Sequence, residues 1–151
     1  MNLTPKLNFP PINLRATREK ERVMVFDNIR RMYVVLTPEE WVRRHLVEFL
    51  VTHCNAPRLA IVEEYPVNIN GMAQRADIVA LNRETKPLVI VECKEPNVRI
   101  DQAVLDQVVR YNSVLHCRYV VVTNGVATYS FMLTEEGKYR PLDHFPCCAE
   151  L

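Results

Sequence analysis

The sequence predicts an α/β fold in which a mixed β-sheet is flanked by helices. Two segments carry apolar residues at helical spacing, several short runs are apolar and rich in β-branched residues, and turn signals separate them. The chain has 151 residues, of which 48% are hydrophobic and 25% are charged, as in one globular domain with a sizeable core. We expect an α-β-β-β-α-β order after an N-terminal arm or hairpin.

The first predicted helix begins after Thr37, which is a suitable N-cap. Pro38 stands at the first helical position and Glu40 follows three residues after the cap, which together make a capping box. The helix is expected to end near His53. Four apolar residues form its core stripe: Val42, Leu46, Phe49 and Leu50.

The segment before this helix, residues 1–36, is expected to be an arm or hairpin. Ile12–Thr17 and Arg22–Phe26 alternate apolar and polar residues around a charged turn. Residues 37–133 would form the core of the domain. Residues 134–151 are expected to form a tail, because no pattern is visible in them.

A meander of three strands is expected after the first helix. Leu59–Ile69 and Gln74–Leu81 are joined by an Asn70-Gly71 turn, and Pro87–Lys94 follows a short polar connection. Residues Pro87–Val91 are apolar on both faces, which is typical of a central strand.

A second helix and a strand pair complete the predicted fold. Tyr119–Thr123 is short and very apolar, and the Asn124-Gly125 turn leads into a last strand near Ala127–Leu133. The helix, Ile100–Leu115, is predicted from apolar residues at helical spacing: Ile100, Val104, Val108 and Leu115.

Two acids and a lysine are predicted to meet on this sheet. Alternate side chains of a strand share a face, so Glu92 and Lys94 point one way and Cys93 the other. Asp77 lies on the neighbouring strand, and two nearby carboxylates repel unless a cation neutralises them. We therefore expect Mg²⁺, with Mn²⁺ as a substitute, bound by Asp77 and Glu92 beside Lys94. The alternative is a surface salt bridge, for example between Asp77 and Arg75.

Composition narrows the class of protein. A net charge of +1 argues against a protein that coats nucleic acid without specificity, although Lys and Arg outnumber Asp and Glu by nine to five up to Arg44. No apolar run could span a bilayer and no signal peptide is visible, so a cytoplasmic protein without a membrane partner is expected. Five cysteines without metal-ligand spacing favour reduced thiols. They are Cys54, Cys93, Cys117, Cys147 and Cys148.

Several segments, in order, resemble a known family. The sequence is similar to the N-terminal nuclease domain of type I restriction enzyme R subunits, in particular to small stand-alone relatives, within the PD-(D/E)XK nuclease superfamily. The resemblance covers roughly residues 8 to 132. Its segments are Phe26-Asp27 with Arg30 and Tyr33, Leu36–Arg43, Val91–Lys94, Asp106–Asn112 and Val122–Gly125.

The resemblance implies a restriction-endonuclease-like core with Asp77 and Glu92 as ligands of Mg²⁺ and Lys94 orienting a water or stabilising charge on the phosphate. It implies that Gln107 and Tyr111, which share a helix face at i and i+4, border the active site. The alternative for this pair is burial with satisfied hydrogen bonds.

Such nucleases often place a further acid on the first helix. Glu40 is our choice over Glu39 and Glu48, although its place in the capping box is a sufficient structural reason for it. Arg43 and Arg44 could meet phosphate, whereas solvated helix arginines are commoner.

The expected function is Mg²⁺-dependent hydrolysis of DNA phosphodiester bonds, with DNA and other restriction or repair subunits as partners and a homodimer as an option. Ala76 replaces the proline of the motif, which is a tolerated change. With three glycines and no G-x-x-x-x-G-K-[ST] loop, the chain is not expected to drive ATP-dependent translocation. The alternatives are a catalytically silent nucleic-acid- or partner-binding module and a small-molecule phosphohydrolase, for which a phosphate-enclosing loop is missing.

Overall fold

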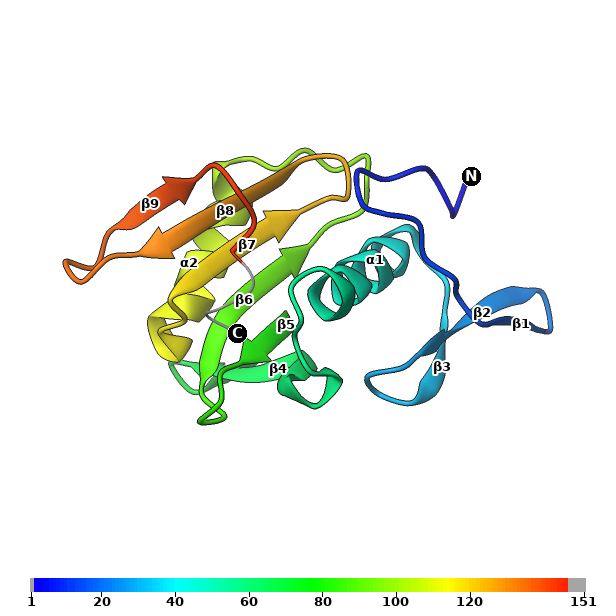
Figure 1. The fold of residues 1–151 in the computed structure, drawn as a ribbon, viewed down its shortest axis with the longest axis horizontal. Coiled ribbons are helices and arrows are strands. Elements are labelled where there is room, and N and C mark those ends of the chain that lie inside the picture. The colour runs from blue at the N-terminus through cyan, green and yellow to red at the C-terminus, as the bar shows by residue number, and fades with distance from the viewer. Residues whose placement is uncertain (1, 147–151) are drawn as a thin grey trace.

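The computed structural model describes residues 2–146, which form two helices and two β-sheets (Figure 1). The helices are α1 (Pro38–Thr52) and α2 (Gln102–Leu115), and Arg58–Ala60 is a 3₁₀ turn. Strands β1 (Ala16–Glu19), β2 (Arg22–Asp27) and β3 (Met32–Val35) make an antiparallel N-terminal sheet. The second sheet has the spatial order β4 (Ile61–Ile69), β5 (Met72–Leu81), β6 (Pro87–Cys93), β7 (Tyr119–Thr123), β8 (Thr128–Leu133) and β9 (Tyr139–Leu142).

The predicted α/β class is confirmed. Neighbouring strands of the six-stranded sheet are antiparallel except β6 and β7, which are parallel. A parallel pair needs a crossover connection, and α2 supplies it. Neither helix among residues 2–146 is long and apolar enough to cross a membrane.

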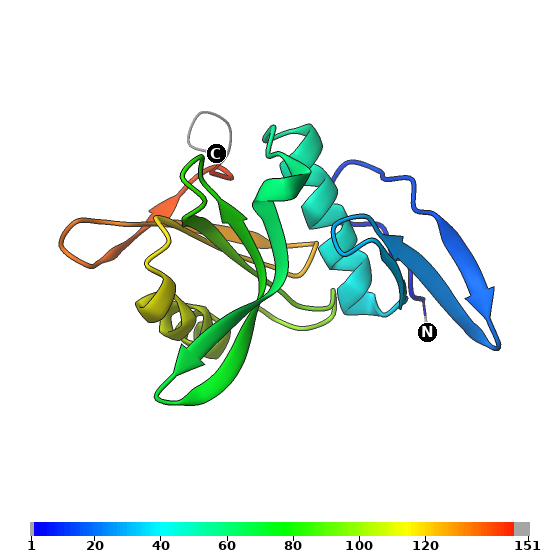
Figure 2. The same cartoon turned by 90° about the horizontal axis from the view of Figure 1, so that it is seen from below.

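The two helices cover opposite faces of the six-stranded sheet, and the N-terminal sheet lies on the far side of α1 (Figure 2). Strand β6 is buried on both faces, as its apolar run predicts. On the α1 face, Val42, Leu46 and Leu50 pack with residues that include Ile78, Val89 and Val91. On the α2 face, Val108 and Tyr111 pack with residues that include Ile90, Val120 and Val122.

Helix α1 has the boundaries that its capping signals predict. The Thr37 hydroxyl oxygen accepts the Glu40 N–H at 3.0 Å, and His53 closes the helix by donating its N–H to the Phe49 carbonyl. Helix α2 begins two residues later than predicted. Asp101 is its N-cap and accepts the Val104 N–H at 3.2 Å, so Ile100 precedes the helix.

The predictions for the chain ends were partly wrong. Strand β1 begins at Ala16 rather than at Ile12, the sequence pattern does not predict β3, and β9 lies within residues 134–151, where a tail is expected. These three strands have four residues each, and no regular alternation of buried and exposed residues marks them. They are strands because each one pairs with a neighbouring strand. The periodicity of a sequence does not reveal such pairing. Cys147 and Cys148 lie outside the described residues.

The N-terminal arm crosses the turn between β7 and β8. Asn8 donates its backbone N–H to the Gly125 carbonyl and its side-chain amide to the Val126 carbonyl, each at 2.7 Å. Gly125 has a φ of +85°, and a Cβ there would lie 2.7 Å from a methyl group of Leu7. Only glycine therefore fits this crossing without strain.

Cys93 is completely buried on the α1 face, so it points away from Glu92 as predicted. Burial raises the pKa of the Cys93 thiol well above its ordinary value. Cys93→Ala is expected to lower the free energy of unfolding by about 1–2 kcal/mol through lost packing, measured by urea denaturation. Metal binding should persist, because the substitution keeps the backbone N–H of residue 93. Rapid modification of Cys93 in the folded protein, located by mass spectrometry, would contradict this burial.

Candidate functional site

The two predicted acids lie together where β5 and β6 separate. The ladder between these strands ends at the pair Ile78 and Val91, and Asp77 and Glu92 are the next residues. The Cys93 N–H donates to Asp77 Oδ2 at 2.8 Å, and the Asp77 N–H donates to Glu92 Oε1 at 3.4 Å. A backbone N–H thus holds each carboxylate at the place where the two strands separate.

The Glu92 carboxyl lies in surroundings that disfavour its negative charge. It is buried, with 5% of the residue exposed. Burial and the nearby Asp77 carboxylate raise the pKa of Glu92 to about 8, although Lys94 acts in the opposite direction. The protein alone therefore disfavours the ionised form of this carboxyl, and a divalent cation between the two acids would favour it.

Lys94 directly follows β6 and is anchored by its backbone N–H, which donates to the Thr123 carbonyl of β7 at 2.9 Å. Its charge acts on Glu92 and also on Glu39 at the start of α1. The structure therefore brings Asp77, Glu92 and Lys94 into one electrostatic environment. The pairing of Asp77 with Arg75 is not what forms: Arg75 Nη1 lies 3.5 Å from Glu64 Oε2.

Glu40, the predicted helix acid, lies among arginines, and its role at the site stays a prediction. Its carboxylate is buried, 3.3 Å from Arg30 Nη2 and 3.6 Å from Arg43 Nε. Burial and the Asp77 carboxylate raise the pKa of Glu39, so Glu39 lies near enough to Asp77 for the two charges to interact. Glu48 forms an ion pair elsewhere, at 3.0 Å from Arg58.

Arg43 reaches the site from α1, a contact that the sequence did not reveal. Its Nη2 donates to Asp77 Oδ1 at 3.4 Å, and only 9% of its side chain is exposed. Arg43 follows Glu40 and Glu39 at i,i+3 and i,i+4, which is the spacing of ordinary ion pairs on a helix surface. The sequence pattern therefore shows no sign of its contact with Asp77. Four glutamates have carboxylate oxygens within 4 Å of its guanidinium: Glu39, Glu40, Glu63 and Glu64.

A buried ionic network connects Arg43 to the N-terminal sheet. Arg44 Nη1 lies 2.8 Å from Asp27 Oδ1, and Arg44 Nη2 also donates to Glu63 Oε1. Arg30 Nε lies 2.6 Å from Asp27 Oδ2. The turn between β2 and β3 is thereby tied to α1 and β4. Since these three arginines face carboxylates, part of the basic excess near the N-terminus is unavailable to DNA phosphates.

Gln107 and Tyr111 lie on the sheet face towards which Glu92 points. The Gln107 amide donates to the Tyr111 hydroxyl at 3.1 Å, and 4% of Tyr111 is exposed. Tyr111 packs in the cluster that contains Val122, and Val122 is in register with Glu92 on the adjacent strand. The pair thus satisfies one hydrogen bond internally, and a role at the active site stays a prediction.

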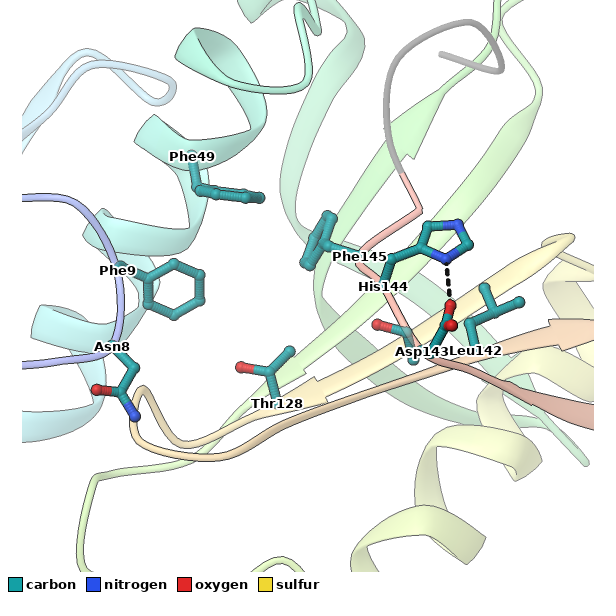
Figure 3. A pocket seen from close by; sticks show the side chains of 9 residues that line it. Asn8, Phe9, Phe49, Thr128, Leu142, Asp143, His144 and Phe145 are labelled. Carbon is teal, nitrogen blue, oxygen red and sulfur yellow. Dashed lines mark hydrogen bonds and ion pairs between the residues drawn. The ribbon is translucent and has the colours of Figure 1, made fainter.

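The pocket in Figure 3 is a separate feature. It has a volume of about 280 Å³ between the N-terminal arm, α1, β8 and the end of β9, and none of the predicted site residues lines it. The ring of Phe49 contacts those of Phe9 and Phe145, with centroids 5.5 and 5.0 Å away. The pocket follows from packing of the arm against the core.

A comparison with protein families decides the relationship. The model of the family described as type I restriction enzyme R protein N terminus (HSDR_N) matches residues 38–146. The chain belongs to this family. The matched region runs from the first residue of α1 past β9, and so includes both helices and the whole six-stranded sheet.

A solved structure has a fold similar to that of this chain. It is a fragment of a protein described as an HsdR subunit of a type I restriction enzyme from Vibrio vulnificus YJ016, with 24% sequence identity and a TM-score of 0.56. The similarity covers 72% of this chain and 23% of the other chain. No curated protein matches the sequence significantly.

The acid pair is compatible with a hard divalent cation. Residues 2–146 contain no group of three or more His, Cys, Asp or Glu side chains that could hold a metal ion. Mg²⁺, however, is commonly bound by one or two carboxylates and keeps several of its waters. Burial and the neighbouring Asp77 carboxylate raise the pKa of Glu92, so negative charge on this pair is poorly compensated by the surrounding protein. Asp77 and Glu92 therefore fit Mg²⁺ better than a metal that requires a complete cage of protein ligands.

Proposed function

We propose that this chain is a Mg²⁺-dependent nuclease unit that hydrolyses DNA phosphodiester bonds. The observation that carries the proposal is the buried pair of Asp77 and Glu92, followed by Lys94, in a member of the type I restriction R-protein family. A carboxylate pair that raises the pKa of one member to about 8 is costly for folding, and such costs concentrate at functional sites.

Asp77 and Glu92 would hold the ion. When bound, Mg²⁺ supplies a water of lowered pKa and polarises a phosphoryl oxygen. Lys94 cannot ligate a cation, so it would orient the attacking water or stabilise negative charge that grows on the phosphate. Glu39 would accept a hydrogen bond from water at the edge of the site, since 45% of its side chain is exposed.

DNA is the substrate class that this proposal implies, and other restriction subunits are the natural protein partners. The chain spans less than a quarter of the similar solved chain. Activities that depend on ATP would therefore reside in other parts of such an assembly, because this sequence has no phosphate-binding G-x-x-x-x-G-K-[ST] loop.

A second candidate is a catalytically silent module that binds nucleic acid or a partner protein. The contact between Arg43 and Asp77 favours it, because an arginine that neutralises an acid can make a metal unnecessary. A nuclease requires metal binding and cleavage of DNA, so a protein that lacks either would fit the silent module better.

Calorimetric titration with Mn²⁺ tests the proposed site. Wild-type protein is expected to bind Mn²⁺, and Asp77→Asn should weaken binding at least tenfold, or about 1.4 kcal/mol, because it removes a charged ligand. Asp106→Asn is the matched control, since Asp106 is exposed on α2 and accepts a hydrogen bond from Gln102 one turn earlier. Equal affinities of wild type and Asp77→Asn would exclude Asp77 as a ligand.

A further inference from the structure

We propose that Arg43 is a resident counter-cation of the site: it keeps Asp77 in place without metal, and its charge reduces the affinity for divalent cations. Arg43 is thus a positioning residue that acts through Asp77. The inference rests on the proposed function in one respect, namely that Asp77 and Glu92 form the metal site.

The contacts of Asp77 show how Arg43 can hold this carboxylate without preventing ligation. Arg43 Nη2 donates to Oδ1 at 3.4 Å, and the Cys93 N–H donates to Oδ2 at 2.8 Å. A carboxylate oxygen has two lone pairs, so each oxygen retains an acceptor position. The two donors therefore fix the orientation of Asp77 and leave it able to bind a cation.

The surroundings of Arg43 exclude the usual alternative, a phosphate-binding arginine. Its side chain is 9% exposed and lies within 4 Å of carboxylate oxygens of Glu39, Glu40, Glu63 and Glu64. A DNA phosphate would have to approach through this negative charge and displace it. Its Nε is buried without a hydrogen bond among the described residues, so ion pairs and the bond to Asp77 hold it.

Electrostatics gives the direction of the effect on metal binding. A guanidinium stays charged at all physiological pH values, so its field at the carboxylate pair is permanent. A divalent cation that ligates Asp77 would come within a few ångströms of this charge in a site of reduced dielectric constant. Neutralising Arg43 should therefore strengthen metal binding. An arginine that was the sole support of Asp77 would predict the opposite, because its loss would disorder the carboxylate. Here the Cys93 N–H still holds Asp77 Oδ2 when Arg43 is replaced.

The experiment is Mn²⁺ calorimetry on the full chain with variants that separate charge from structure. Arg43→Gln, which is neutral, is expected to bind Mn²⁺ about tenfold more tightly than wild type, and Arg43→Lys, which keeps the charge, within about twofold of wild type. Arg58→Gln is the control, since Arg58 forms an exposed ion pair with Glu48. Arg43→Met, neutral and of similar length, replaces the glutamine variant if that variant does not fold.

The outcomes separate this inference from the proposed function. If wild type binds Mn²⁺ and folded Arg43→Gln binds it equally or more weakly, the inference is overturned and the metal site stands. If Arg43→Gln binds and wild type does not, the inference is supported. Absence of binding in wild type and in every neutral variant overturns both.

A measurement without metal tests the holding of Asp77 independently. Arg43→Gln should lower the thermal midpoint of the metal-free protein less in an Asp77→Asn background than in wild type, because the two residues share one contact. Equal shifts in both backgrounds would contradict the proposed contact.

Discussion

Lys94→Ala is expected to lower the rate of DNA cleavage about a hundredfold or more, without weakening Mn²⁺ binding. A lysine ammonium cannot ligate a cation, so its contribution is to the transition state, where negative charge grows on the phosphate. Interactions that form only there affect turnover rather than ground-state binding. Plasmid nicking with Mg²⁺ or Mn²⁺ gives the rate, and calorimetry gives the affinity.

Two further variants make this result interpretable. Lys86→Ala removes an exposed lysine from the turn between β5 and β6 and should nick DNA at the wild-type rate. Glu92→Ala should lose both metal binding and cleavage. If wild type and Lys94→Ala nick DNA equally fast, the activity comes from a contaminant or from another site. If wild type binds metal but cleaves no DNA, the silent module becomes the better account.

Arg44→Met is expected to lower the free energy of unfolding by about 3–5 kcal/mol. The Arg44 side chain is 2% exposed and contacts the carboxylates of Asp27 and Glu63, whose side chains are completely buried. Removing the cation leaves buried carboxylates with too few partners, which costs far more than loss of a surface pair. Arg58→Met is the control and should cost no more than about 1 kcal/mol, because its ion pair is exposed.

The cost of Arg44→Met should grow with pH. Burial raises the pKa of Glu63 to about 7 despite its contact with Arg44, so the stability that this shift contributes is present below pH 4.5 and lost as pH rises through 7. Loss of Arg44 raises the pKa of Glu63 further and extends this decline to higher pH. Urea denaturation at pH 5 and pH 8 should therefore show the larger destabilisation at pH 8. An equal or smaller cost at pH 8 would contradict the assignment of Arg44 as the partner of Glu63.

Local sequence determined both helices, strands β4 to β8 and the two acids Asp77 and Glu92. The capping residues at Thr37–Glu40 set the start of α1, and the two-residue period of β6 placed Glu92 and Cys93 on opposite faces. Asp77 could be paired with Glu92 because a meander makes successive strands neighbours. These properties depend on short-range backbone geometry, so neighbouring residues suffice to predict them.

Tertiary structure decided which charged residues meet. Glu39 and Glu40 are adjacent in sequence and about 100° apart around α1, so only the rotation of the helix against the sheet determines which one senses Asp77. The partners of Arg43 and Arg44 come from β2, β4 and β5 as well as from α1. Charged side chains carry no periodic signal for burial, because their burial depends on counter-charges from distant segments. Asp77 and Glu92 could therefore be predicted from the sequence, whereas Glu39 and the contacts of the surrounding arginines could be identified only from the tertiary structure.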